Sequence, residues 1–163
     1  YGSLPNYTYG ITGNFKYKDF DLSLLFDAVG HWKSVYSGTG IYETNYDGIF
    51  SELHRHAWTK ERWDNNEEIT YPALSTKANT NQQPSDFFVY DRSFFRLKNL
   101  EIGYTLPTLL VKHIGLEKVR FVLSGHNLFT AHHMKTKDFG PELNSYLSIP
   151  IYRTYNVGVE VSF

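Results

Sequence analysis

The sequence predicts an all-β fold of the antiparallel transmembrane β-barrel class, and three observations support this prediction. Five segments alternate apolar and polar residues with the period of two that is typical of β-strands. Each segment is about ten residues long or longer, which is enough to cross a bilayer at a tilt, whereas strands of soluble proteins average nearer five or six. The connections alternate between short and long, as they do at the two ends of bacterial barrels.

The composition limits the classes of function to consider. The net charge of −1 gives no field that would attract a nucleic acid, so no nucleic-acid partner is expected. The chain has no cysteine, which excludes thiolate catalysis, disulfides and cysteine-ligated metal. No apolar run is long enough for a transmembrane helix. The start at Tyr1 resembles neither a signal peptide nor an initiation sequence, so we expect a processed or partial chain.

The first two predicted strands, 7–17 and 20–33, form a β-hairpin around a turn at Lys18-Asp19. The apolar face of the first strand contains Tyr7, Tyr9, Ile11, Phe15 and Tyr17. The apolar face of the second strand contains Phe20, Leu22, Leu24, Phe26, Ala28 and Trp32.

The third predicted strand, 93–106, changes phase in its middle. Phe95 and Leu97 occupy odd positions, whereas Leu100 and the apolar residues after it occupy even positions. One extra residue near Lys98-Asn99, a β-bulge, would restore a single apolar face. The alternative is that Phe95 and Leu97 face a packed interior.

The last two strands are predicted at 119–129 and 152–163, and a short helical turn is predicted between Thr108 and Gly115. The long loops at 34–92 and 131–151 both fall outside the cell if the final residue is periplasmic. Five strands are too few to close a membrane barrel, which needs at least about eight, so further strands must complete the fold.

The two faces of these strands carry different side chains. Tyr17, Phe20, Tyr104 and Phe163 fall near the periplasmic strand ends and fit an aromatic girdle. On the other face we expect polar residues to pair around the barrel wall, or against a part of the protein inside it. These polar residues are Asp21, Asp27, Arg120, Asn156 and Glu160.

The end of the chain is the most informative motif. The final residue, Phe163, is preceded at alternate positions by Val161, Val159, Val157 and Tyr155. This pattern resembles the C-terminal β-signal of Gram-negative outer-membrane proteins, which the barrel assembly machinery recognises during insertion. The alternative is an ordinary amphipathic edge strand that ends in phenylalanine.

The loops offer no strong chemical site. His54 and His56, and likewise His132 and His133, have spacings that can ligate metal, but a solvated or packing role in the loop is several times commoner. The acidic residues between 61 and 68 are interpreted as a solvated loop. We therefore expect no catalytic residue, no cofactor and no metal, and a protein that is not an enzyme.

Four ordered blocks resemble the SusC/RagA-like TonB-dependent transporters. The blocks are 91–107 (DRSFFRLKNLEIGYTLP), 119–130 (VRFVLSGHNLFT), 150–158 (PIYRTYNVG) and, in the first loop, Trp58-Thr59 followed by 71–75 (YPALS). Two positions depart from the family pattern, because His126 replaces a common glutamine and Ala73 replaces the usual arginine.

The resemblance implies the C-terminal part of a barrel of about 22 strands, of which residues 1–163 supply the last five. It implies active import of oligosaccharides or other large nutrients, peptides included, across the outer membrane of a Gram-negative bacterium. It also implies a SusD-like surface lipoprotein as a lid, and TonB acting through an N-terminal plug that these residues do not contain.

Aromatic residues of the first long loop are candidates for contact with the substrate or the lid, because aromatic faces stack on sugar rings. These residues are Tyr36, Tyr42, Tyr46, Trp58, Trp63 and Tyr71. The alternative, which we consider the more common one, is that they pack the loop on itself.

Two other classes of protein remain open. One is a different outer-membrane barrel, such as a porin or an autotransporter translocator, which would have no lid. The other is a soluble sugar-binding β-sandwich, which would bury each apolar face against a second sheet.

Overall fold

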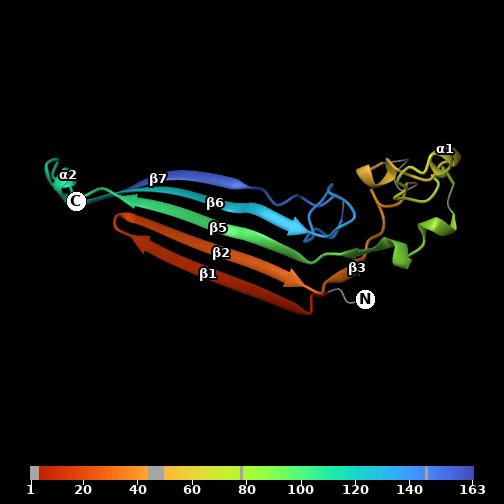
Figure 1. Cartoon of the computed structure of the whole chain (residues 1–163), viewed down its shortest axis with the longest axis horizontal. Helices are drawn as coiled ribbons and strands as arrows, with labels where there is room; N and C mark the ends of the chain where they lie inside the picture. Colours follow the sequence, from red (N-terminus) through yellow and green to blue (C-terminus); the bar gives the residue numbers. More distant parts are fainter. Residues whose placement is uncertain (1–3, 44–49, 78, 146) are drawn as a thin grey trace. The chain divides into compact units, whose positions relative to one another are not determined.

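The computed structural model describes residues 4–43, 50–77, 79–145 and 147–163. The chain divides into two compact units (Figure 1). The first, here called the sheet unit, comprises 7–30, 94–131 and 151–163. The second, here called the loop unit, comprises 1–6, 31–93 and 132–150. Each unit has its own internal contacts.

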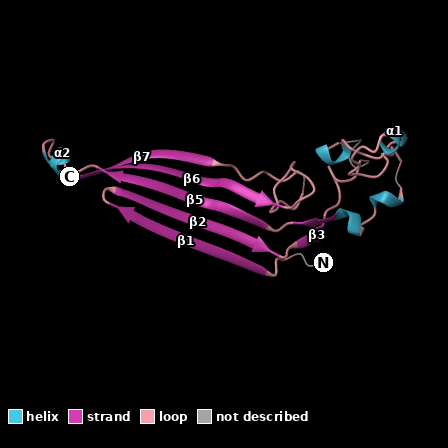
Figure 2. Ribbon diagram, viewed as in Figure 1, coloured by secondary structure: helices cyan, strands magenta, loops and turns pink. Residues whose placement is uncertain are grey.

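The sheet unit is one five-stranded sheet with the strand order β1-β2-β5-β6-β7 (Figure 2). Its strands are β1 (Tyr7–Tyr17), β2 (Phe20–Gly30), β5 (Phe94–Thr105), β6 (Lys118–His132) and β7 (Thr154–Ser162). β1 pairs with β2, β2 with β5, and β6 with β7, each in antiparallel register. The register of the last pair runs from Lys118 opposite Ser162 to His126 opposite Thr154.

The β1–β2 hairpin follows the period-two pattern along its whole length. Tyr17 lies opposite Phe20 and Tyr7 lies opposite Gly30. Lys18 takes a positive φ of 53° in the turn between the strands. The turn therefore needs only two residues, and the apolar residues of both strands lie on the same face of the sheet.

The predicted β-bulge is confirmed. Leu25 lies opposite Asn99, and the next residue, Phe26, lies opposite Leu97, so Lys98 is the extra residue. Phe95 then lies on the apolar face, where its ring stacks on Phe26 with the centroids 5.2 Å apart. Phe95 is 41% exposed, so it does not face a packed interior.

Two predicted strand boundaries were wrong. The second strand was expected over 20–33 but ends at Gly30, and the next residue, His31, takes a positive φ of 55°. Residues Lys33–Val35 form a separate strand, β3, which pairs with β4 (Val89–Asp91). The first long loop, expected to be irregular over 34–92, therefore contains a small sheet.

The fourth strand was expected over 119–129 but runs from Lys118 to His132. The predicted end was placed where the alternation of apolar and polar residues stops, but the strand continues beyond that point. Arg96 of β5 still donates a hydrogen bond from Nε to Thr130 Oγ1, at 3.0 Å, beyond the predicted boundary. The second long loop, expected over 131–151, therefore lies between His132 and Thr154 and is shifted along the chain by two residues.

A short helix, α2 (Thr108–Lys112), connects β5 to β6. It begins directly after Pro107, which is unable to continue the strand pairing. Gly115, at φ 75°, ends the turn, and the Leu116 N–H donates to the Val111 carbonyl at 3.1 Å. Across the described ranges, every helix is too short or too polar to span a membrane.

The loop unit surrounds a small aromatic core. It contains β3, β4, the helix α1 (Lys60–Asp64) and the 3₁₀ turns Glu52–His54, Thr80–Gln82 and Asp86–Phe88. Its buried residues come from both long loops: Tyr36, Ile41, Tyr42, Leu53, Ala57, Tyr71, Phe88, Tyr90, Met134 and Phe139. Edge-to-face ring contacts recur in this core, as between Tyr42 and Phe88 at 5.0 Å.

Candidate functional site

One face of the sheet unit is apolar and exposed. Val157 is 84% exposed and Phe163 is 89% exposed. The other large exposed residues of this face include Tyr9, Ile11, Phe15, Phe20, Ile102, Phe121, Leu123, Tyr155, Val159 and Val161. Soluble monomers rarely expose an apolar surface that extends over a whole sheet. The face therefore requires an apolar covering that the described residues do not provide.

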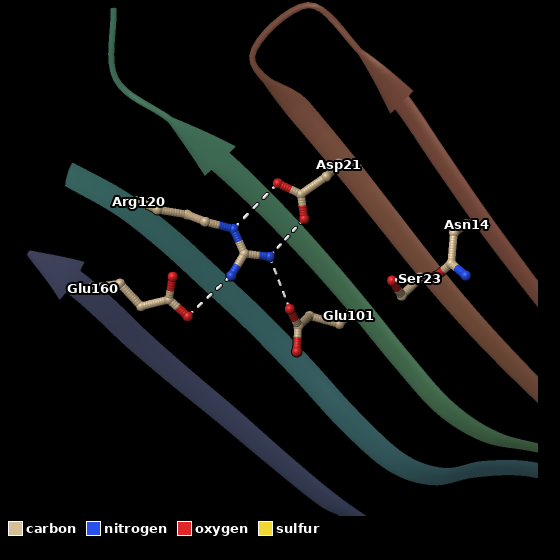
Figure 3. A network of polar contacts seen from close by, with 6 residues as sticks. All are labelled: Asn14, Asp21, Ser23, Glu101, Arg120 and Glu160. Carbon is tan, nitrogen blue, oxygen red and sulfur yellow. Dashed lines mark hydrogen bonds and ion pairs between the residues drawn. The ribbon is translucent and has the colours of Figure 1, made fainter. Parts of the chain in front are cut away.

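The opposite face carries an ion network centred on Arg120 (Figure 3). The Arg120 guanidinium donates to both carboxylate oxygens of Asp21, at 3.1 and 2.5 Å. It also donates to Glu101 at 2.8 Å and to Glu160 at 3.0 Å. Its planar fork of donors allows one side chain to bind three carboxylates at once. Because the four residues lie on β2, β5, β6 and β7, this network joins four of the five strands.

Further polar contacts continue along the same face. Ser23 Oγ donates to Asn14 Oδ1 at 2.8 Å, and Lys98 Nζ lies 3.4 Å from Asp27 Oδ2. Asn156 Nδ2 lies 3.5 Å from Ser124 Oγ. The prediction that the polar residues of this face pair with one another is confirmed among the strands of this sheet. A depression of about 300 Å³ is lined by Thr12, Ser23, Asn99, Glu101, Ser124 and His126, together with Leu24, Leu25 and Leu100.

In the loop unit, Tyr71 and Glu43 form a buried polar pair. The Tyr71 hydroxyl lies 2.8 Å from Glu43 Oε2 and 2.8 Å from the Ile41 carbonyl oxygen. Burial, followed by the hydrogen bond to Glu43, raises the pKa of Tyr71 well above its usual range. Burial alone would raise the pKa of Glu43, but hydrogen bonds from its own backbone, Tyr71 and other donors outweigh burial and lower it. Glu43 is therefore a buried carboxylate held in its charged form.

His54 lies beside this pair and is held as one neutral tautomer. Its Nδ1 accepts a hydrogen bond from the Ser51 N–H at 3.0 Å, so the proton is on Nε2, which lies 3.1 Å from the Ile41 carbonyl oxygen. Burial lowers the pKa of His54 and outweighs the opposing effects of these bonds and of the carboxylates of Glu43 and Asp138. His54 is thus a packing residue, with its ring 4.5 Å from that of Tyr71.

Arg92 fixes the second loop to the first. Its guanidinium stacks on the Trp32 ring at 3.7 Å and donates from Nε to the Pro141 carbonyl oxygen at 2.6 Å. It also donates to the Leu143 carbonyl oxygen at 3.2 Å, which accepts a second bond from the Tyr36 hydroxyl at 2.6 Å. Nothing in the sequence pattern indicates this role of Arg92, although the residue stands in the 91–107 block that resembles the transporter family.

The structure divides the aromatic candidates of the first loop into two groups. Tyr36, Tyr42 and Tyr71 are buried in the core of the loop unit, so the expectation that they contact a substrate or lid is corrected. Trp58 and Trp63 are 43% and 65% exposed. Tyr46 lies outside the described residues. Trp63 borders a depression of about 270 Å³ together with Asn66, Glu67 and Ile69.

The remaining candidates lie on β7, which is an edge strand of the sheet. Tyr155, Val157, Val159 and Val161 share the exposed apolar face, opposite Gly125, Leu123, Phe121 and Val119 of β6. Among the residues whose placement is described, no group of three or more His, Asp or Glu side chains is arranged to hold a metal ion.

Comparisons with known proteins give consistent results. TonB-dependent receptor P3 of Formosa agariphila is 31% identical over 98% of this chain, and TonB-dependent receptor P26 of the same organism is 24% identical over 77%. The RagAB peptide importer in its open-open state matches 99% of the chain with a TM-score of 0.70 and 26% identity. No protein-family model matches.

The chain spans only 16% of the length of receptor P3 and 17% of the matched RagAB chain. A two-faced sheet of long strands that aligns over nearly its whole length with these proteins defines a segment of a TonB-dependent receptor. More particularly, the chain belongs to the SusC/RagA-like TonB-dependent transporters.

Proposed function

We propose that this chain forms the last five strands of a barrel of about 22 strands that imports large nutrients across the outer membrane of a Gram-negative bacterium. The observation that carries the proposal is the contrast between the two faces of the sheet. One face exposes Val157, Val159 and their apolar neighbours, and the other carries the Arg120 network. In a barrel, the first face contacts lipid and the second lines the lumen.

The lumen role of the polar face follows from its charge. Arg120 is the centre of three carboxylates, so the network retains two negative charges after pairing. Such a surface is stable against water or against a polar domain inside the barrel, and it is costly against hydrocarbon. Import itself would depend on an N-terminal plug, which lies in another part of such a protein, and on TonB as a partner that acts through that part.

The loop unit is the proposed external surface. Its two long loops lead from strand ends opposite to the Lys18-Asp19 turn, and Trp58 and Trp63 expose aromatic rings there. We propose that these rings contact a SusD-like surface lipoprotein or the substrate. The substrate is an oligosaccharide or a peptide; the second possibility draws support from the peptide importer RagAB, which is a structural relative.

The terminal strand has a second proposed role during biogenesis. Tyr155, Val157, Val159, Val161 and Phe163 form an exposed apolar row on an edge strand. An edge strand offers unpaired backbone groups to a partner strand, which is the chemistry that the barrel assembly machinery needs for recognition.

The membrane arrangement is tested by cysteine labelling, which the absence of cysteine from this chain makes simple. Single cysteines are introduced at Val157 and Val159, and at Ser124 and Asn156 as matched controls on the other face, in the protein as the cell makes it. Any cysteines elsewhere in that protein are removed first. A lipid-soluble maleimide should label the first pair and a water-soluble one the second. Equal labelling of both pairs by the water-soluble reagent would refute the barrel.

The import role is tested in cells. Deletion of the gene should abolish growth on one class of nutrient, with oligosaccharide and peptide mixtures offered separately as sole sources. Trp63→Ala should lower uptake of the same nutrient or the recovery of a co-purifying lipoprotein, whereas Phe15→Ala on the lipid face should change neither. Unchanged growth of the deletion strain on both classes would refute nutrient import.

A further inference from the structure

The connection between β5 and β6 exposes apolar side chains that the fold does not use. Leu109 is 81% exposed, Leu110 is 61% exposed and Ile114 is 69% exposed. Within the helix α2 and the residues after it, Val111 is the large apolar residue that turns inward, and it is almost completely buried. The connection therefore has a packed inner side and an apolar outer side, and water alone would not favour the outer side.

Backbone hydrogen bonds fix this apolar tip at one end of the sheet. The Leu106 N–H donates to the Val119 carbonyl at 2.8 Å, and the Glu117 N–H donates to the Ser162 carbonyl at 2.9 Å. The tip thus lies beside Ser162, the last residue of β7, and near the C-terminus of the chain (Figure 1). It is a fixed part of the sheet unit and not a separate segment.

The same end of the sheet carries the aromatic residues that are typical of a membrane interface. The Phe20 and Tyr104 rings are in contact, with centroids 4.5 Å apart, and Tyr17 next to them is largely exposed. Lys18 lies over the Tyr17 ring, with Nζ 5.4 Å from the centroid. Aromatic rings and lysines of this kind concentrate where the acyl chains of a bilayer meet its headgroups.

The charges beside the tip fit the same environment. Lys112, His113 and Lys118 are all exposed, against Glu117 as the acidic residue of the segment 106–118. An exposed leucine pair with flanking lysines is the composition of a segment that lies in a membrane surface, with lysines near lipid phosphates. A binding surface for a basic protein would need the opposite charge.

We infer that Leu109, Leu110 and Ile114 insert into the phospholipid surface at the periplasmic side of the membrane, beside the aromatic girdle. These three residues are here called the foot. This inference rests on the proposed function, because it requires the sheet to cross the outer membrane. The occupant of the apolar tip is lipid at the boundary between headgroups and acyl chains. The foot fixes the depth of the last strands in the bilayer.

The test measures depth with nitroxide-labelled lipids. Single cysteines at Leu109, Leu110 and Ile114 receive a fluorophore in the whole protein, reconstituted in phospholipid vesicles. Nitroxides near the headgroup should quench these three labels by about two-fold or more, and more strongly than nitroxides deep in the acyl chains. A label at Val157 should show the opposite preference, and one at Ser124 should be quenched by neither lipid.

The outcomes separate the two proposals. Shallow quenching at Leu109, Leu110 and Ile114 supports the foot. Quenching at Val157 without quenching at these three positions overturns the foot and leaves the barrel intact, and it would mean that water or another protein faces the tip. No quenching at Val157 overturns the proposed membrane function, and the foot with it. Because all three substituted residues are exposed, at least one variant should fold normally.

Discussion

The two units of this chain differ in whether their apolar side chains are buried or exposed. The loop unit buries its aromatic residues inside itself, so that Tyr71, Tyr90 and Phe88 are each about 1% exposed. The sheet unit leaves its apolar residues outside, as at Val157 and Phe163. The loop unit therefore carries its own hydrophobic core, whereas the sheet unit depends on its surroundings to cover its apolar face.

Tyr71→Ala should have the largest effect, and only in the loop unit. It removes a buried ring that contacts His54 and Phe88, and such losses cost about 3 to 5 kcal/mol. Hydrogen exchange followed by mass spectrometry should show fast exchange in the loop peptides and unchanged exchange in β6. Tyr71→Phe, which keeps the ring, should cost about 1 to 2 kcal/mol through the lost hydroxyl contacts. Equal acceleration in both units would mean that they do not fold independently.

Val159→Arg should destabilise the sheet unit next most strongly, and only in a membrane. A cation on the lipid face costs about 2 to 4 kcal/mol near the middle of the bilayer. Asn156→Arg on the same strand but on the polar face is the matched control, and it should cost far less. Urea unfolding in lipid vesicles measures both variants. If the two variants were equally stable, the assignment of the faces would be wrong.

Arg120→Met should destabilise the sheet by about 2 kcal/mol, because it leaves three carboxylates near one another without a cation. Asp21→Asn in the same protein should restore part of the loss by removing one of those charges. Arg120→Lys should be intermediate, since a single ammonium does not reproduce the forked geometry. A double variant no more stable than Arg120→Met would show that the carboxylates do not repel one another in the folded protein.

The smallest expected effect is a pH dependence of the loop unit. The pKa of His54 is lower in the folded protein than the ordinary value of about 6.5, so its stabilisation is complete above that pH. As the pH falls below about 6.5, His54 binds a proton in the unfolded state before it does so in the folded state. The unfolded state is then favoured, and the stabilisation of the folded loop unit is lost. Proteolysis of the loops should therefore be faster at about pH 5.5 than at about pH 7.5, because these two values lie on either side of the ordinary histidine pKa of about 6.5. His54→Gln should flatten the difference.

The sheet unit was largely predictable from the sequence, and the loop unit was not. A strand reports its two faces through the alternation of its side chains, so even the bulge at Lys98 was visible as a change of phase. The predicted end of the second strand was wrong near His31, because a single side chain does not indicate that its backbone takes a positive φ.

The core of the loop unit depends on contacts between residues far apart in the chain. The Tyr36 hydroxyl meets the Leu143 carbonyl across 107 positions, and Arg92 meets Pro141 across 49. Irregular backbone has no period that would separate inward from outward residues. The sequence therefore showed an aromatic loop but could not tell that Tyr71 is buried and Trp63 exposed.

The four residues of the Arg120 network are spread over almost the whole length of the chain. Asp21 comes near its beginning, Glu101 and Arg120 lie further along, and Glu160 stands three positions before the last residue. Glu160 follows Arg120 by 40 positions, so the complete set of ion pairs forms only when β7 is in register with β6. A slip of β7 by one residue would turn Glu160 to the apolar face and remove it from the network.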